Sequence, residues 1–81
     1  MGDKPQTLAR LAAGESAIVS EIKLPEGDQS RLLEMGLITG TPVELIRFAP
    51  LGDPIEVRVR GYHLTLRKHE ADQIFVTKTG D

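Results

Sequence analysis

The 81-residue sequence contains no cysteine, and aromatic residues make up only 4% of it. Without cysteine, disulfides and thiolate metal sites are excluded, so the fold must be held by apolar packing. The scarcity of aromatic side chains leaves few platforms on which bases can stack. No apolar run approaches the length that spans a bilayer, so we expect no direct membrane insertion. The opening residues also lack the apolar stretch of a signal peptide, which favours a cytoplasmic location.

An excess of charge of one sign is also missing. Ten basic and twelve acidic residues leave a formal charge of −2 at pH 7, and neither end carries a block of like charges. The densest basic group is Arg58, Arg60, Arg67 and Lys68. Glu56 lies among these residues on the same predicted hairpin face, and stacking residues are few. We therefore predict that the chain does not bind nucleic acid.

Motifs for nucleotide or acyl-transfer chemistry are absent too. The chain has no phosphate-binding loop ending in Lys-Ser/Thr and no GxGxxG, GxSxG or HExxH; each of these supplies a specific catalytic or binding geometry. The serines Ser16, Ser20 and Ser30 have no histidine nearby in sequence to act as a base. The sequence thus predicts a protein that is not an enzyme.

What the sequence does contain is a series of short β-like segments separated by glycine and proline. Strands are predicted at 16–23, 42–48, 55–60, 63–67 and 74–76, with a helical turn at 69–73. Adjacent Leu45 and Ile46 either leave the facing of the second strand unassigned or indicate a bulge in it. Leu8 and Leu11 have the spacing of one further helical turn. We predict a single mainly β domain over 1–81, a small SH3-like barrel of about five strands with an ordered core near 7–77. Residues 1–6 and 78–81 are predicted to be mobile.

The strongest local pattern is the hairpin between Ile55 and Arg67, where apolar and polar residues alternate. A two-residue turn at Gly61-Tyr62, with glycine first as a type II′ turn requires, is predicted to join the strands. This register pairs Val59 with Leu64, Val57 with Leu66, and Glu56 with Arg67. It places the apolar pairs on one face, and a slip by one residue would destroy that arrangement.

One short helix is predicted before the second strand. Asp28 or Ser30 can cap its first turn, and it runs to about Met35. Gly36 can end it in the left-handed conformation, with Leu37 packing back on the helix. The expected core face is Leu32 with Met35, and the expected solvent face is Arg31 with Glu34.

The candidate metal ligands are two histidines, His63 and His69, with Glu70 and Asp72 near the second. Their spacing matches no recognised ligand pattern, so we predict no dedicated metal site within one chain and no required cofactor. Weak capture of Zn²⁺ or Fe²⁺ between two chains stays open, because such a site needs only one or two ligands from each chain.

Several apolar residues lie at or near predicted turns: Leu24, Leu37, Phe48 and Leu51. Two or three of these exposed together would form a patch suited to a protein partner. Core packing is the alternative for each residue taken singly.

The order of motifs along the chain resembles the FeoA family. The matching residues are Arg31-Leu32-Leu33-Glu34-Met35-Gly36-Leu37 with Gly40, Ala49 to Pro54, Val59 to Tyr62 with Leu64 to Arg67, and Glu70-Ala71 with Ile74. The likeness spans about Leu8 to Val76, nearly the whole chain. FeoA proteins are small cytoplasmic accessory proteins of bacterial ferrous iron transport and are similar to SH3 domains in fold.

The resemblance implies a partner, the membrane permease FeoB, which carries a cytoplasmic GTP-binding domain and moves ferrous iron inward. The expected role is to bind and modulate that permease, with Arg31, Leu37 and Leu51 at the contact. The alternative is a metal-responsive regulatory module that forms a metal-bridged homodimer, since this domain type also ends metal-dependent repressors. The chain lacks the DNA-binding helices of such repressors, which favours the transport role.

Overall fold

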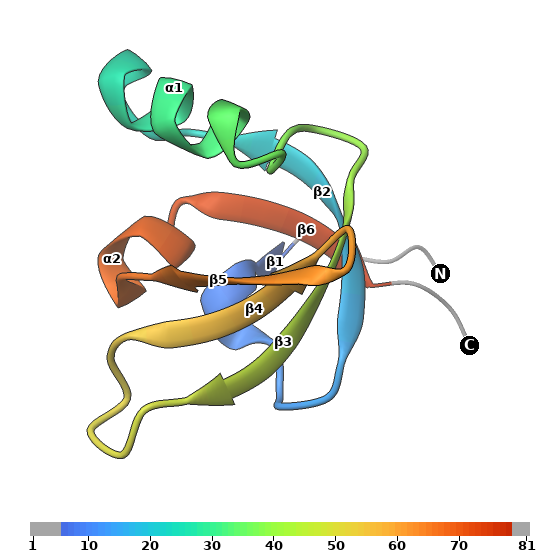
Figure 1. Cartoon of the computed structure of the whole chain (residues 1–81), viewed down its shortest axis with the longest axis vertical. Helices are drawn as coiled ribbons and strands as arrows, with labels where there is room; N and C mark the ends of the chain where they lie inside the picture. Colours follow the sequence, from blue (N-terminus) through green and yellow to red (C-terminus); the bar gives the residue numbers. More distant parts are fainter. Residues whose placement is uncertain (1–5, 79–81) are drawn as a thin grey trace.

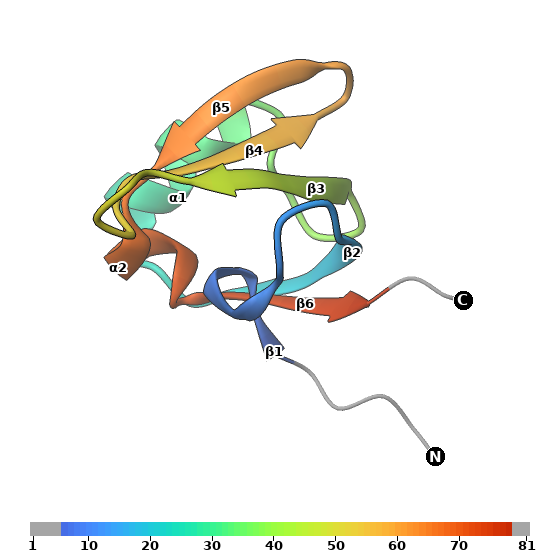
Figure 2. The ribbon, with the colours of Figure 1, turned by 90° about the horizontal axis from the view of Figure 1, so that it is seen from below.

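Valine, isoleucine and leucine at alternate positions direct one face of each strand into a common core. The computed structural model describes residues 6–78, in which six antiparallel strands form one sheet in the order β1-β6-β2-β3-β4-β5. The strands are β1 (Gln6–Thr7), β2 (Ser16–Ile22), β3 (Pro42–Phe48), β4 (Ile55–Val59), β5 (Tyr62–Leu66) and β6 (Ile74–Lys78). The sheet curves around the core (Figures 1 and 2). The predicted mainly β class is confirmed.

Three helical segments complete the fold: η1 (Leu8–Arg10), α1 (Glu26–Glu34) and α2 (Lys68–Ala71). Both predicted helical turns and the predicted helix are therefore present, and α1 lies above β2 (Figure 1) with Leu32 buried in the core. None of the helices within residues 6–78 is long and apolar enough to cross a membrane. Strand β1 was not predicted. Gln6 and Lys78, assigned to mobile ends by the sequence, lie in β1 and β6, while residues 1–5 and 79–81 lie outside the described part of the chain.

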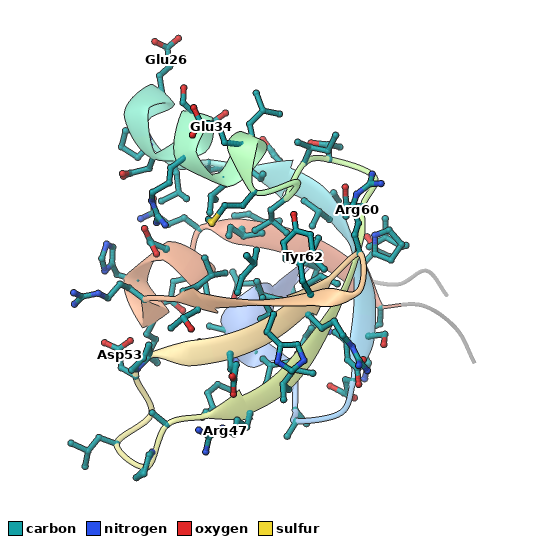
Figure 3. All side chains as sticks on the ribbon, viewed as in Figure 1. Glu26, Glu34, Arg47, Asp53, Arg60 and Tyr62 are labelled. Atoms are coloured by element: carbon teal, nitrogen blue, oxygen red, sulfur yellow. The ribbon has the colours of Figure 1, made fainter. Side chains whose placement is uncertain are left out.

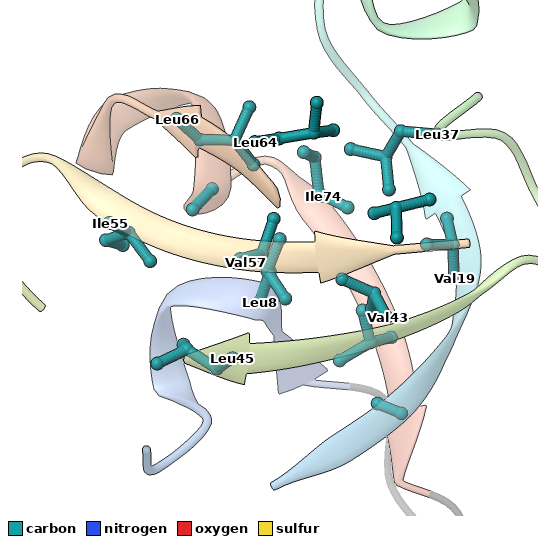
Figure 4. Close-up of a cluster of buried hydrophobic side chains, with 14 of the residues drawn as sticks. Leu8, Val19, Leu37, Val43, Leu45, Ile55, Val57, Leu64, Leu66 and Ile74 are labelled. Carbon is teal, nitrogen blue, oxygen red and sulfur yellow. The ribbon is translucent and has the colours of Figure 1, made fainter. Parts of the chain in front are cut away.

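The core is aliphatic and draws on every strand from β2 to β6 (Figure 4). Its largest fully buried side chains are Leu8, Leu11, Val19, Leu32, Leu37, Val43, Leu45, Ile55, Val57, Val59, Leu66 and Ile74. Leu64 is also buried, and Met35 is half-buried against this cluster. Ala17 and Val19 are the buried positions of β2, and Ile18 between them is half-buried. A register shift between Val19 and Glu21 pairs Ile22 with the buried Ile74, so Ile22 packs against the core while staying half-buried. The predicted bulge in β3 is confirmed by a register shift between Leu45 and Arg47.

Helix α1 begins earlier than predicted. Its N-cap is Pro25, the first helical residue is Glu26, and no side chain caps the first turn. The prediction of a cap at Asp28 or Ser30 is therefore wrong. Glu26 and Asp28 place negative charge in the first turn, where it interacts favourably with the helix dipole.

The end of α1 is as predicted. Gly36 has φ +89°, and the Leu37 N–H donates to the Leu32 carbonyl at 2.9 Å, the hydrogen bond of a Schellman motif. A side chain at Gly36 would also meet the Tyr62 hydroxyl, because an added Cβ would lie 3.2 Å from that oxygen. The Tyr62 hydroxyl donates to the Met35 carbonyl, which ties the hairpin turn to the helix end.

Alanine substitutions at two glycines should therefore change stability in opposite directions. Gly36→Ala should lower the free energy of unfolding by about 1–2 kcal/mol, because a left-handed conformation strains any residue with a Cβ. Gly27→Ala is the matched control. Gly27 lies within α1 with open space around its Cα, so alanine there should raise stability by up to about 1 kcal/mol. Urea denaturation measures the free energy of unfolding of both variants. Equal changes in the two would contradict this account of the helix end.

The hairpin register differs from the predicted one by two residues. Val59 pairs with Tyr62, and Val57 with Leu64. The turn consists of Arg60 (φ +53°) and Gly61 (φ +89°). Two positive φ values characterise a type I′ turn, whose twist matches that of the flanking strands. The predicted type II′ turn at Gly61-Tyr62 is therefore wrong. A shift of two residues leaves every side chain on its predicted face, so the alternation of apolar residues could not distinguish the two registers.

Candidate protein-binding surfaces

The three residues predicted to contact a partner do not form one surface. Leu37 is 0% exposed and belongs to the core. Leu51 is 95% exposed in the loop between β3 and β4. Arg31 lies on α1, which Figure 1 places at the opposite end of the molecule from that loop. Leu37 is thus unavailable for contact in this fold, while Arg31 and Leu51 belong to separate faces.

Arg31 connects the two helices. Its guanidinium donates to Oε2 of Glu70 in α2, and Glu70 is only 6% exposed. The other carboxylate oxygen, Oε1, accepts the backbone N–H of Arg67 at 3.0 Å, as in a capping box at the start of α2. A buried carboxylate is tolerable when it is paired and hydrogen-bonded in this way. The Arg31–Glu70 pair therefore fixes α1 to α2.

The surroundings of Glu70 also set its protonation. Burial alone would raise the pKa of the Glu70 carboxyl, but the backbone N–H of Arg67 and the guanidinium of Arg31 outweigh that effect. Together they hold the pKa below its ordinary value of 4.5. Glu70 is thus ionised at neutral pH and engaged in structural contacts.

The residues proposed as metal ligands are not gathered together. Residues 6–78 contain no group of three or more His, Cys, Asp or Glu side chains that could hold a metal ion. Glu70 is committed to Arg31, and the Asp72 carboxylate lies 3.8 Å from the Lys68 ammonium. His63 Nδ1 lies 4.0 Å from the Glu56 carboxylate on the exposed side of the hairpin. The described side chains of one chain therefore do not fit a resident metal ion.

The outer face of the sheet is covered by ion pairs. Arg58 contacts Glu44 at 2.6 Å, and Arg47 contacts Glu56 at 2.9 Å. Glu56 lies opposite Thr65 in the observed register, so its predicted pairing with Arg67 is wrong. Of the four residues in the basic group, these pairs neutralise Arg58, and Lys68 lies 3.8 Å from the Asp72 carboxylate.

Sequence reasoning missed a cleft between α1 and β2 that is lined by polar and apolar side chains. The cleft has a volume of about 520 Å³, and its lining includes Ile22, Leu33 and Ile38. Leu33 is 60% exposed and Ile38 is 37% exposed. The adjacency of Leu32 and Leu33 was the available signal, because neighbouring residues on a helix point about 100° apart and a short helix cannot bury both on one side.

Comparison with known proteins agrees with the fold and with the motifs. The family model described as the FeoA domain matches residues 6–78. The solution structure of FeoA from Chlorobium tepidum superposes with a TM-score of 0.89 at 42% identity, covering 94% of this chain and 73% of that one.

Two further relatives concern function. Stenotrophomonas maltophilia FeoA, solved in complex with zinc and described as a prokaryotic SH3 domain protein, has a TM-score of 0.73 at 33% identity and covers 88% of each chain. A fusion of Fe(2+) transport protein A with the Fe(2+) transporter FeoB from Porphyromonas gingivalis is 32% identical over 69 residues. That match takes in 85% of this chain but only 8% of the fusion protein. The predicted SH3-like fold is confirmed, and the chain belongs to the FeoA family.

Proposed function

We propose that this protein is a non-enzymatic, cytoplasmic accessory of bacterial ferrous iron uptake that binds and modulates a FeoB-type permease. The observation that carries the proposal is the Porphyromonas gingivalis fusion, in which a segment similar to this chain is joined to the FeoB transporter. Covalent linkage keeps two domains at high effective concentration, which suits domains that act on each other.

The surface of the barrel is consistent with docking. Leu51 is almost fully exposed at a loop tip, and a large apolar side chain there can enter a pocket on a partner. Arg31 is part of the Arg31–Glu70 pair, with its side chain 45% exposed. Its remaining N–H groups are available to a partner's acceptor.

The direct test is an amide-shift titration of the labelled protein with the soluble cytoplasmic part of the permease. We expect shift changes in the 49–54 loop or around α1, and about a tenfold loss of affinity for Leu51→Gln if this loop is a main anchor. Leu51→Gln should keep the wild-type circular dichroism spectrum, since the side chain has no packing to lose. A titration without shifts at saturating partner concentration would refute the proposed role, whereas unchanged affinity of Leu51→Gln would remove only this loop.

The second candidate function is a metal-responsive module that binds a divalent ion between two chains. It is favoured by the zinc complex of the Stenotrophomonas maltophilia relative and by the exposed His63–Glu56 pair, which offers two ligands from one chain. Sedimentation with zinc or ferrous iron should then show twice the monomer mass, reverting on chelation. An unchanged mass would favour the accessory role alone.

A further inference from the structure

The cleft between α1 and β2 has a mixed lining, in which apolar side chains stand among serine, threonine, glutamine and glutamate side chains. Helix α1 lies above β2 with its outer side free (Figure 1). Leu33 from the helix, Ile22 from the strand and Ile38 from the segment after the helix all line the cleft. The remaining apolar residue of the lining, Leu37, is fully buried and belongs to the core. Apolar side chains that are exposed in a cleft, as Leu33 and Ile38 are, are typical of surfaces that bind another molecule.

The rim of the cleft is acidic. The charged residues that line it are Glu21 and Glu26, and within residues 6–78 neither carboxylate has an ion pair. Glu34 adds a further exposed carboxylate on the same helix, and Figure 3 shows Glu26 pointing outward at the far end of α1. Negative charge around an apolar groove attracts a segment with positive charge flanking its apolar side chains.

The cations closest in sequence are engaged elsewhere. Arg31 is bound to Glu70, and the Lys23 ammonium lies over the Phe75 ring, 5.2 Å from its centroid. Neither residue lines the cleft. The chain therefore does not neutralise this rim with the lysine and arginine that flank it, and a cationic partner segment would meet little competition.

We propose that this cleft is the docking site for a cationic amphipathic segment of the partner. Its apolar side chains would lie between Leu33 and Ile38, and its lysine or arginine side chains would lie beside Glu21 and Glu26. This inference rests on the proposed function in one respect, that the segment belongs to the permease. Apolar contact supplies affinity, and the acidic rim selects the sign of the segment's charge.

Matched synthetic peptides test the chemistry without the permease. The probe is a labelled fourteen-residue peptide of leucine and lysine with helical periodicity; one control replaces each lysine by glutamate, and another replaces each leucine by serine. We expect only the leucine–lysine peptide to bind and to shift the amides of residues 20–22 and 33–39. Equal binding of the glutamate or the serine peptide, no binding of any peptide, or shifts confined to another face would overturn the proposal.

Substitutions in the cleft test where the leucine–lysine peptide binds. Leu33→Gln should weaken binding of this peptide about tenfold, as expected for loss of an anchor side chain. Glu21→Gln with Glu26→Gln should weaken it several-fold and reduce its dependence on salt. Thr65→Gln, at an exposed position of β5 that does not line the cleft, is the control and should bind the leucine–lysine peptide as the wild type does. Variants of the cleft that bind like the control would contradict the assignment.

The same measurements separate this proposal from the proposed function. Binding of the permease domain with shifts outside residues 20–22 and 33–39 would refute the cleft as its docking site and leave the accessory role standing. Binding of the leucine–lysine peptide in the cleft, with no binding of the permease domain, would support the site and refute the accessory role.

Discussion

Replacing Leu37 by alanine should lower the free energy of unfolding by about 2–5 kcal/mol, the range measured when a buried leucine is truncated. Leu37 is fully buried, and its N–H completes the hydrogen bond that ends α1. Its side chain also forms the wall shared by the core and the α1–β2 cleft. The cavity left by the truncation would loosen both the core packing and the wall of the cleft.

The matched control is Leu51→Ala. Leu51 is 95% exposed, so its truncation should change stability by no more than about 0.5 kcal/mol. Urea titrations of both variants give the comparison, with equal slopes showing that the transitions are comparable. Equal stabilities of the two variants would mean that Leu37 is not packed as described. Any loss of partner binding in Leu37→Ala must be corrected for the unfolded fraction.

Glu70→Gln should lower the free energy of unfolding at pH 7 by about 1.5–3 kcal/mol, the worth of hydrogen bonds to a charged group. The amide is neutral and has one acceptor oxygen, so it cannot accept from both the Arg31 guanidinium and the Arg67 N–H as the carboxylate does, and the link between α1 and α2 would weaken. Glu34→Gln is the control, because Glu34 is an exposed carboxylate on α1, and the stability of this variant should stay within about 0.5 kcal/mol of the wild type.

The effect should depend on pH in a defined direction. Since the pKa of Glu70 lies below its ordinary value of 4.5 in the folded protein, ionised Glu70 stabilises the fold fully above that value. This contribution is lost as the pH falls through the folded pKa. The difference between wild type and Glu70→Gln should therefore be largest near neutrality and shrink in acid. A difference that is constant across this range would contradict the assignment of the charge.

Local signals in the sequence were sufficient for the class of the fold and for several of its details. Alternating β-branched residues identified the strands because a strand with one face in the core needs a period of two. Gly36 marked the end of α1, since a left-handed residue there favours glycine whatever surrounds it. The adjacent Leu45 and Ile46 indicated the bulge in β3. Each of these features depends on residues close together in the chain.

Contacts between segments that are distant in the chain could not be predicted from these local signals. Two hairpin registers agree equally well with the alternation, and only the turn at Arg60-Gly61, which places Tyr62 against the end of α1, distinguishes them. Arg31 and Glu70 are 39 residues apart, and nothing local marks them as a pair. The sequence therefore suggested Glu70 as a possible metal ligand, whereas in the structure its carboxylate joins α2 to α1 through Arg31.

Composition and local patterns were enough to specify a cysteine-free β barrel with one short helix, and the motifs pointed to the FeoA family. Which leucines are exposed could be learned only from the folded chain. Leu37 and Leu51 both lie in connecting segments, yet one is buried under α1 and the other projects from a loop. The reason is that burial depends on what the rest of the chain packs against a residue, and that information is spread over the whole fold.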